Sequence, residues 1–181
     1  FSSRVGQWTQ PGIIKSIQRG TISLAPAATT NTATITAVDP GNTRLMWLGN
    51  ESTEDGNTSV PSTGTRIVLT NATTVTASRL AGTGTCTVGY EVIEYWPGVM
   101  RTVQRGTVTA TAAISGTATL ATTLQTITKA TLDIMGWDYN TALLLDSILG
   151  LVVITNTTTI TLTRANNSGN LTAGYQVVEW F

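Results

Sequence analysis

Polar and apolar residues alternate along short runs through most of the chain. The segment 33–38 places small or apolar side chains between threonines, and the segment 16–21 follows the same period of two. This period is typical of a strand with one face buried and one face in water. Threonine is abundant almost everywhere, and it suits the solvent-facing positions of strands because it tolerates both a pleated surface and water. The pattern therefore predicts β structure.

Turn signals separate these runs. Asp39-Pro40-Gly41-Asn42 combines a proline that fixes φ with residues that tolerate a positive φ, and Ala81 to Gly84 is rich in glycine,. A polar surface loop is expected at 50–64. The strands expected in the first half of the chain are the run that begins at Ile13 and the segments 33–38, 44–49, 66–69, 73–79 and 86–95.

The second half of the chain repeats the first. Residues 11–22 recur as residues 97–108 with only conservative changes, and residues 70–76 and 89–95 recur as 155–161 and 174–180. Such an internal repeat has to be recognised before a fold is assigned. We expect an N-terminal arm at residues 1–10 and two β units at 11–96 and 97–181. With about six strands in each unit and little helix, the expected fold class is all-β, with two similar antiparallel sandwich or barrel units in tandem.

The two copies differ at one place. The first copy has the polar loop 50–64, whereas the second copy has an aromatic segment followed by the apolar run 143–154. One interpretation is burial of this segment against a partner, and the other is a short amphipathic helix that covers the end of its own barrel. The candidate contact residues are Trp137, Tyr139, Leu143, Leu144, Leu145, Ile148 and Leu149. In the arm, Trp8 is expected to dock against this subunit or a neighbour.

The charge and hydropathy patterns exclude several classes of partner. Ten basic residues balance ten acidic residues, and only 11% of the chain is charged. Neither nucleic acid nor an anionic membrane is therefore an expected partner. No apolar run approaches the ~20 residues that a spanning helix needs. The first residues also lack the charged start and apolar core of a signal peptide,.

Candidate chemistry is sparse. The chain has no histidine and a single cysteine, Cys86, which excludes intrachain disulfides and the common zinc sites. We interpret Cys86 as a small core residue rather than a reactive thiol. Glu91 and Glu94 would lie on opposite faces of a strand, a poor geometry for general acid and base catalysis of one bond. Glu51, Glu54 and Asp55 are expected to form a solvated loop rather than a cation site.

We therefore expect no catalytic residue, no cofactor, no metal and no enzymatic activity. Each copy does repeat two arginines and one glutamate near its end. These residues are open to two readings, an arginine–carboxylate fork that ties the first strand to the last, which we favour, and a repeated contact between subunits. The residues concerned are Arg19, Arg105, Arg79, Arg164, Glu94 and Glu179.

The repeated motifs resemble a known class of protein. Ile14 to Gly20, the strand Leu69 to Arg79 and the ending Val88 to Glu94 are similar to the threonine-rich β modules of tailed bacteriophage virion structural proteins. The resemblance covers both copies but not the arm or the run 143–154. It implies a virion protein, assembled in the host cytoplasm, that forms homo-oligomers.

Two roles for such a protein stay open. The favoured one is an outer capsid decoration or cement protein that contacts other virion proteins, such as the major capsid protein or neck and tail components, and sister subunits. The alternative is a fibre or receptor-binding module of the tail or head. Its exposed loops, with Trp47, Trp137 and Tyr139, would bind host glycans by aromatic stacking.

Overall fold

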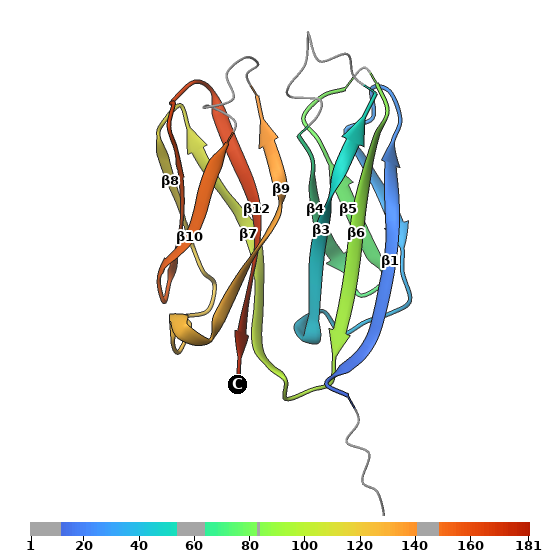
Figure 1. Ribbon diagram of the computed structural model, residues 1–181, viewed down its shortest axis with the longest axis vertical. Coiled ribbons are helices and arrows are strands. Elements are labelled where there is room, and N and C mark those ends of the chain that lie inside the picture. Colours follow the sequence, from blue (N-terminus) through green and yellow to red (C-terminus); the bar gives the residue numbers. More distant parts are fainter. Residues whose placement is uncertain (1–11, 54–63, 83, 141–148) are drawn as a thin grey trace, which may run out of the picture.

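The structure is a computed structural model that describes residues 12–53, 64–82, 84–140 and 149–181. The arm with Trp8 and the candidate residues Leu143, Leu144, Leu145 and Ile148 lie outside the described residues. Within the described residues the chain forms twelve strands and two three-residue 3-10 helices (Figure 1). The predicted all-β class is therefore confirmed.

The strands of the first half and of the second half follow one another in the same pattern. Those of the first half, with one 3-10 helix, are β1 (Ile14–Leu24), β2 (Thr30–Thr34), η1 (Pro40–Asn42), β3 (Thr43–Ser52), β4 (Arg66–Asn71), β5 (Thr74–Ser78) and β6 (Cys86–Tyr95). Those of the second half are β7 (Met100–Thr111), β8 (Ser115–Thr119), η2 (Ile127–Lys129), β9 (Ala130–Tyr139), β10 (Gly150–Asn156), β11 (Thr159–Arg164) and β12 (Asn170–Trp180).

Each half pairs its strands in the same antiparallel order. In the first half β6 lies between β1 and β3, and β5 lies between β2 and β4. In the second half β12 lies between β7 and β9, and β11 lies between β8 and β10. Each half is thus two three-stranded sheets packed face to face. We call residues 14–95 the first unit and residues 100–180 the second unit.

The core of each unit consists of alternate residues of its strands. Along β6, Cys86, Val88 and Val92 are fully buried and belong to the core of the first unit. Along β12, Leu171, Ala173 and Val177 take the corresponding positions in the second unit. The period of two in the sequence arises from this arrangement. It also confirms that Cys86 is a core residue.

The repeated Thr-Asn-x-Thr motifs form the hairpin turns that join β4 to β5 and β10 to β11. The side chain of Asn71 accepts a hydrogen bond from the backbone N–H of Thr73 at 2.9 Å, and that of Asn156 accepts one from Thr158 at 2.8 Å. An Asn side chain that bonds to the backbone two residues later stabilises a tight turn. The motif is therefore explained by turn geometry.

One predicted strand ends early. The pattern predicts a strand at 33–38, but β2 ends at Thr34. The N–H groups of Ile35 and Val38 instead donate to the carbonyls of Thr73 and Ala72, and both side chains are buried. The segment therefore leaves the edge of the sheet to cover the end of the core, which keeps its apolar residues at alternating positions without strand pairing.

For the apolar run 143–154, the predicted amphipathic helix is wrong over the part that the structure describes, whereas burial against a partner stays a prediction. Residues 150–154 belong to strand β10 rather than to a helix, and β10 has in the second unit the place that β4 has in the first. These residues are therefore a regular member of the duplicated fold and not an insertion. Their inward-facing side chains pack on the second core.

The two units share one sheet. Strand β4 of the first unit lies next to β9 of the second, which produces a six-stranded sheet in the order β2-β5-β4-β9-β12-β7. Only four residues, Trp96 to Val99, connect β6 to β7 at the lower end of the molecule in Figure 1. The short connection and the shared sheet place the units side by side.

Candidate functional site

The surface between the two units contains a network of buried and half-buried polar groups. Its centre is Gln176, a fully buried residue of β12. The side-chain amide of Gln176 donates to the carbonyl of Leu45 and accepts from the N–H of Leu45, each at 3.1 Å. It therefore bonds to β3 as a neighbouring strand would, and it satisfies the backbone of a strand that ends its own sheet.

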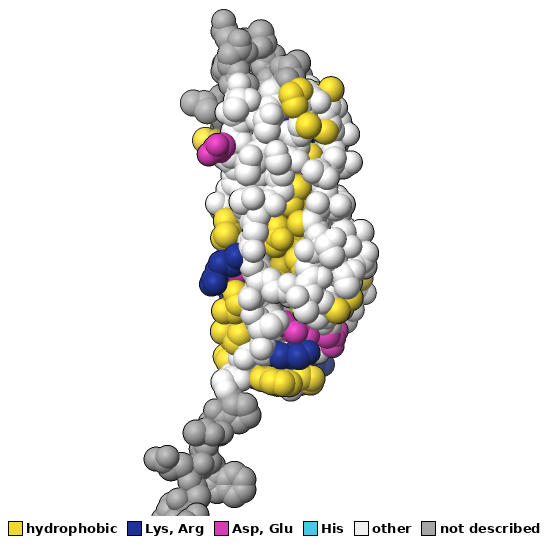
Figure 2. Space-filling model, turned by 90° about the vertical axis from the view of Figure 1, so that its right-hand side faces the viewer, with side chains coloured by type: hydrophobic (Ala, Val, Ile, Leu, Met, Phe, Trp, Pro, Cys, Tyr) yellow, Lys and Arg dark blue, Asp and Glu magenta, His cyan; other side chains and the backbone are white. Residues whose placement is uncertain are grey.

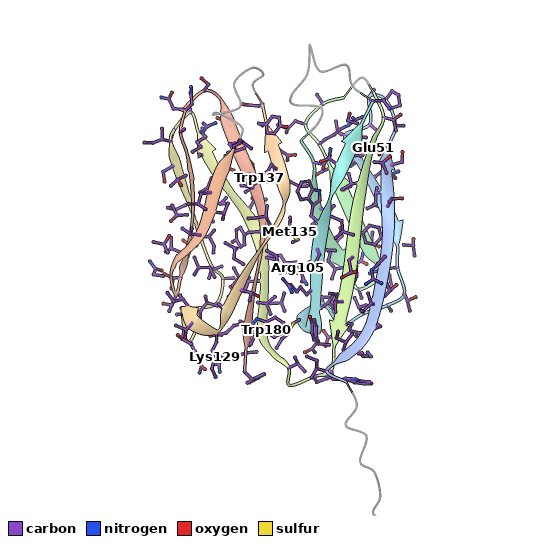
Figure 3. The ribbon with its side chains drawn as sticks, in the orientation of Figure 1. Glu51, Arg105, Lys129, Met135, Trp137 and Trp180 are labelled. Atoms are coloured by element: carbon purple, nitrogen blue, oxygen red, sulfur yellow. The ribbon has the colours of Figure 1, made fainter. Side chains whose placement is uncertain are left out.

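Arg105 on β7 extends this contact. It donates to the side-chain oxygen of Gln176 at 2.8 Å and to the carbonyls of Pro40, at 3.1 Å, and Thr43 in the first unit. Burial lowers the pKa of Arg105 to about 10, so the guanidinium remains charged at neutral pH. Figure 3 shows Arg105 and Met135 lying between the two units.

Two ion pairs flank the centre of this surface. Arg44 of β3 binds Asp133 of β9 with two hydrogen bonds, one of them 2.8 Å long, and these bonds raise the pKa of Arg44 against the opposing effect of burial. Arg66 of β4 binds Asp138 of β9. Burial raises the pKa of Asp138, although the Arg66 guanidinium opposes the shift. Both pairs join the first unit to the second.

A glycine allows the two backbones to meet. The N–H of Trp137 donates to the carbonyl of Thr65 at 2.9 Å, and Arg66 is paired with Gly136. A Cβ atom on Gly136 would lie 2.0 Å from the Thr65 oxygen, and the φ of Gly136 is +94°. Both the positive φ and the close approach require glycine at this position.

Apolar side chains complete the surface between the units. Met135 of the second unit is buried within the core of the first. Nearer the connection, Ile93, Met100 and Val178 form a small cluster of their own. Tyr95 belongs to this cluster as well, and its ring meets that of Trp180 edge to face with the centroids 5.6 Å apart, an arrangement that aromatic pairs favour. The two units are thus joined by a packed apolar contact as well as by polar bonds.

The aromatic residues named for glycan binding do come together. Trp47, Trp137 and Tyr139 line a cavity of about 170 Å³ at one end of the surface between the units, together with Asn50, Gly64, Thr65, Leu149 and Gly150. The indole N–H of Trp47 is buried without a hydrogen-bond partner among the described residues. The cavity is smaller than the roughly 300–1,000 Å³ of pockets that enclose small molecules.

The repeated glutamates hold the first strand of each unit to the last. Glu94 accepts from Lys15 at 2.8 Å, from Ser16 at 3.2 Å and from the N–H of Asp39 at 2.9 Å. Glu179 accepts from the N–H groups of Gln125 and Thr126 and lies 3.2 Å from Arg101. The prediction that the four repeated arginines pair with these glutamates is therefore wrong. The charge comes from Lys15 and Arg101 instead, which stand at the bulges next to Ser16 and Thr102, the residues paired with the two glutamates.

The repeated arginines have other roles. Arg79 donates to the carbonyls of Ala25, Ala28 and Gly84. Arg164 binds carbonyls of the end of β7, of the loop before β8 and of the loop that leads to β12; the acceptors are Ala110, Ala113, Ser168 and Gly169. Each arginine thus satisfies the backbone of two loops at one end of its unit. A motif of Arg directly after a Thr-rich strand does not reveal these acceptors, because they are backbone atoms distant in the sequence.

Catalytic or metal-binding groups do not stand out in the described part of the chain. Glu91 binds Arg19 on the outer face of the first unit, while Glu94 is occupied by the contacts given above. Among the described residues no three His, Cys, Asp or Glu side chains are placed to share a metal ion. Glu54 and Asp55 lie outside the described residues, whereas Glu51 is exposed at the end of β3.

Comparison with known proteins adds no relative. The chain matches no protein-family model, no curated protein and no solved structure. Within the described residues no helix is long and apolar enough to span a membrane. The flank seen in Figure 2 carries few charged side chains, and hydrophobic side chains lie along its middle and at both ends.

Proposed function

We propose that this chain is a non-enzymatic structural protein of a bacteriophage virion, and that it acts as an outer capsid decoration or cement protein. The resemblance of its repeated motifs to threonine-rich virion modules supports the assignment to a virion. The proposal extends to its partners, which are other virion proteins and sister copies of the chain, and to its place in the assembled particle.

The observation that carries the proposal is the use of the polar residues that the two copies repeat. Glu94 and Glu179 fasten first strands to last strands, and Arg79 and Arg164 fasten loops. The buried Gln176 and the half-buried Arg105 join one unit to the other. Polar side chains that hold strands, loops and units together suit a structural protein that must keep its shape within a larger assembly.

Cryo-electron microscopy of intact particles tests this proposal. The expected result is density with two adjacent sandwiches, related by the pairing described above, on the outer surface of the head and in contact with the shell lattice. Density at the tail or neck would contradict the decoration role but would still agree with the assignment to a virion. Absence of the chain from purified particles, measured by mass spectrometry, would reject the proposal as a whole.

A receptor-binding module is the second candidate, and one observation favours it. Trp47, Trp137 and Tyr139 from the two units line a single cavity, and aromatic rings stack on the apolar faces of sugars. A glycan array with the purified protein tests this candidate, with Tyr139→Ala as the matched variant. Binding to a defined glycan that is lost in Tyr139→Ala would favour this function over decoration, whereas no binding on the array would remove it.

A further inference from the structure

The contact between the two units is one-sided, although the units have the same strand order. The second unit contributes the outer face of its β7-β12-β9 sheet, and the first unit contributes the edge formed by β3 and β4. In a contact with a twofold axis, the face of the first unit would bind the edge of the second in return. Here the equivalent face of the first unit and the equivalent edge of the second unit take no part in the contact, and we call them the leftover face and the leftover edge.

The corresponding positions follow from the strand registers. Gly20 faces Tyr90 across β1 and β6 as Gly106 faces Tyr175 across β7 and β12. The bulges in β3 and β9 likewise align Gly49 with Gly136, and the φ angles of these two glycines are +97° and +94°. Leu48 therefore corresponds to Met135, Arg19 to Arg105 and Glu91 to Gln176.

Positions that are covered on the face of the second unit are open on the leftover face of the first. Met135 is 3% exposed because it enters the first core, whereas Leu48 at the corresponding position is 56% exposed. A Cβ on Gly136 would collide with Thr65, whereas nothing lies within 4 Å of a Cβ on Gly49. Around these residues lies an open hollow of about 340 Å³, and it is lined by Thr21, Leu48, Gly49, Asn50, Glu51, Thr87 and Gly89.

The leftover edge of the second unit is apolar. Strand β10 corresponds to β4, but in the described residues it is paired only with β11. Leu149 and Leu151 are 66% and 63% exposed, and a long apolar strand edge is a template for pairing with another chain. The core residues behind this edge are also incompletely covered. Leu45, Ile67 and Leu69 are buried in the first unit, whereas their counterparts Leu132, Val152 and Ile154 are half-buried.

We propose that a second copy of this chain covers these two surfaces, with β10 of one copy placed against the β3 bulge of the next. Leu48 would enter the second core of the neighbouring copy as Met135 enters the first core within the chain. The Arg19 guanidinium would reach the carbonyls of residues 127 and 130 of the neighbour, which correspond to the acceptors of Arg105. Because each contact joins a face to a different surface, copies add head to tail and close into a ring or extend as a filament.

The contact between copies differs chemically from the contact within the chain. In the contact between copies, Thr131 takes the place of Arg44 and Met46 that of Asp133. Leu151 likewise takes the place of Arg66, and Glu51 that of Asp138. The contact between copies therefore has more apolar surface and no equivalent of these two ion pairs. Salt should therefore act on its strength mainly through Arg19 and Glu91, since screening acts on charged groups.

The test uses the full chain and two single variants. Leu48→Glu places a carboxylate on the face of the first unit, and Leu151→Glu places one on the edge of the second. Both residues are exposed, so the fold of an isolated copy should be retained, and the unfolding transition checks this. Ile114→Glu is the matched control, because Ile114 is 61% exposed but precedes β8 on the opposite edge of the sheet.

Sedimentation velocity across a concentration series gives the readout. Wild type and Ile114→Glu are expected to associate beyond a dimer, whereas each of the other two variants stays monomeric over the same range, a weakening of at least about tenfold since an unpaired carboxylate would be buried. An equal mixture of Leu48→Glu and Leu151→Glu is expected to form dimers only, because one intact face and one intact edge remain. This rescue distinguishes a head-to-tail contact from a twofold one.

Three results would overturn the proposal: a wild type that stays monomeric, an association that both variants leave unchanged, and a mixture that stays monomeric. The proposal goes beyond the virion assignment, since it concerns only how two copies meet. A chain that associates as described but is absent from particles would reject the virion function and keep this contact. A chain that is found on the head but is monomeric in solution would support the virion function and reject this contact.

Discussion

Gln176 and Leu45 are bonded to each other through both the donor and the acceptor of the Gln176 amide, so a side chain from β12 takes the place of a neighbouring strand beside β3. Leu45 lies 131 positions before Gln176 in the chain. The contact therefore closes the surface between the two units and shows how an edge strand is satisfied without extending its sheet.

The first prediction concerns this amide. Gln176→Met keeps the length of the side chain but leaves the N–H and C=O of Leu45 and the Nε of Arg105 without their partner. Because these groups are buried, the free energy of unfolding should fall by about 3 kcal/mol. Urea denaturation measures this change. Glu91→Met at the corresponding position is the control, because the Glu91 side chain is half-buried but binds only the exposed side chain of Arg19 across its own sheet, and the expected cost is about 1 kcal/mol or less. Equal costs for the two variants would contradict the role of Gln176.

The second prediction separates backbone strain from close approach. Gly49 and Gly136 have nearly the same positive φ, but only Gly136 lies against the backbone of Thr65. Gly49→Ala should cost about 1–2 kcal/mol through strain alone. Gly136→Ala should cost about 2 kcal/mol more, since the added methyl group forces the two units apart. Thermal and urea unfolding of both variants measure the difference, and a Gly136→Ala variant as stable as Gly49→Ala would show that the strands do not meet at this point.

The third prediction concerns pH. Burial alone would raise the pKa of Glu94, but the hydrogen bonds from Lys15, Asp39 and Ser16 outweigh it, so that the pKa lies below its usual value of 4.5. A carboxyl group with a lowered pKa in the folded state adds stability above pH 4.5, and that stability is lost as the pH falls through the folded value. Wild type should therefore lose unfolding free energy below about pH 4.5 faster than Glu94→Gln.

Urea unfolding at a series of pH values between neutral and acid checks this difference. The comparison with Glu94→Gln is needed because the raised pKa of Asp138 acts in the opposite sense, adding stability at low pH that is lost as the pH rises,. Parallel pH profiles for wild type and Glu94→Gln would show that Glu94 does not contribute in this way.

The fourth prediction concerns the arginines at the loop ends. Arg164 donates to four backbone carbonyls, one at the end of β7 and three in two loops, a pattern that suits the planar fork of a guanidinium but not a single ammonium group. Arg164→Lys should lower the free energy of unfolding by about 2 kcal/mol. Arg19→Lys is the matched control, since the Arg19 side chain is 64% exposed, and it should change stability by less than about 0.5 kcal/mol. Circular dichroism during urea unfolding compares the two.

The sequence predicted the fold class well because strand pairing and burial have the same period. Alternation along residues 86–95 marks β6, and the repeat implied a second copy of each strand. The pattern was less informative where apolar residues serve another purpose. Residues 35–38 alternate like a strand but close the end of a core, and the run at 150–154 is apolar because it is an outer strand of the second unit.

The candidate site was harder to predict. Gln176 occupies an ordinary strand position, and nothing in its sequence neighbourhood indicates a bond to Leu45. The alignment of the two copies does offer one signal, since Gln176 replaces Glu91 and Asp133 replaces Met46, both on the face that contacts the other unit. Differences between otherwise matching copies thus mark the surface where they meet, although their partners depend on the packing of the units.

The four-residue connection between Tyr95 and Met100 has a thermodynamic consequence. Because this linker is so short, each unit meets the other at an effective concentration in the millimolar range or above, and the contact forms without the entropy loss of bringing two separate molecules together. Protease cleavage within residues 96–99 would convert that contact into a bimolecular equilibrium, and dilution of the nicked protein would then separate the halves.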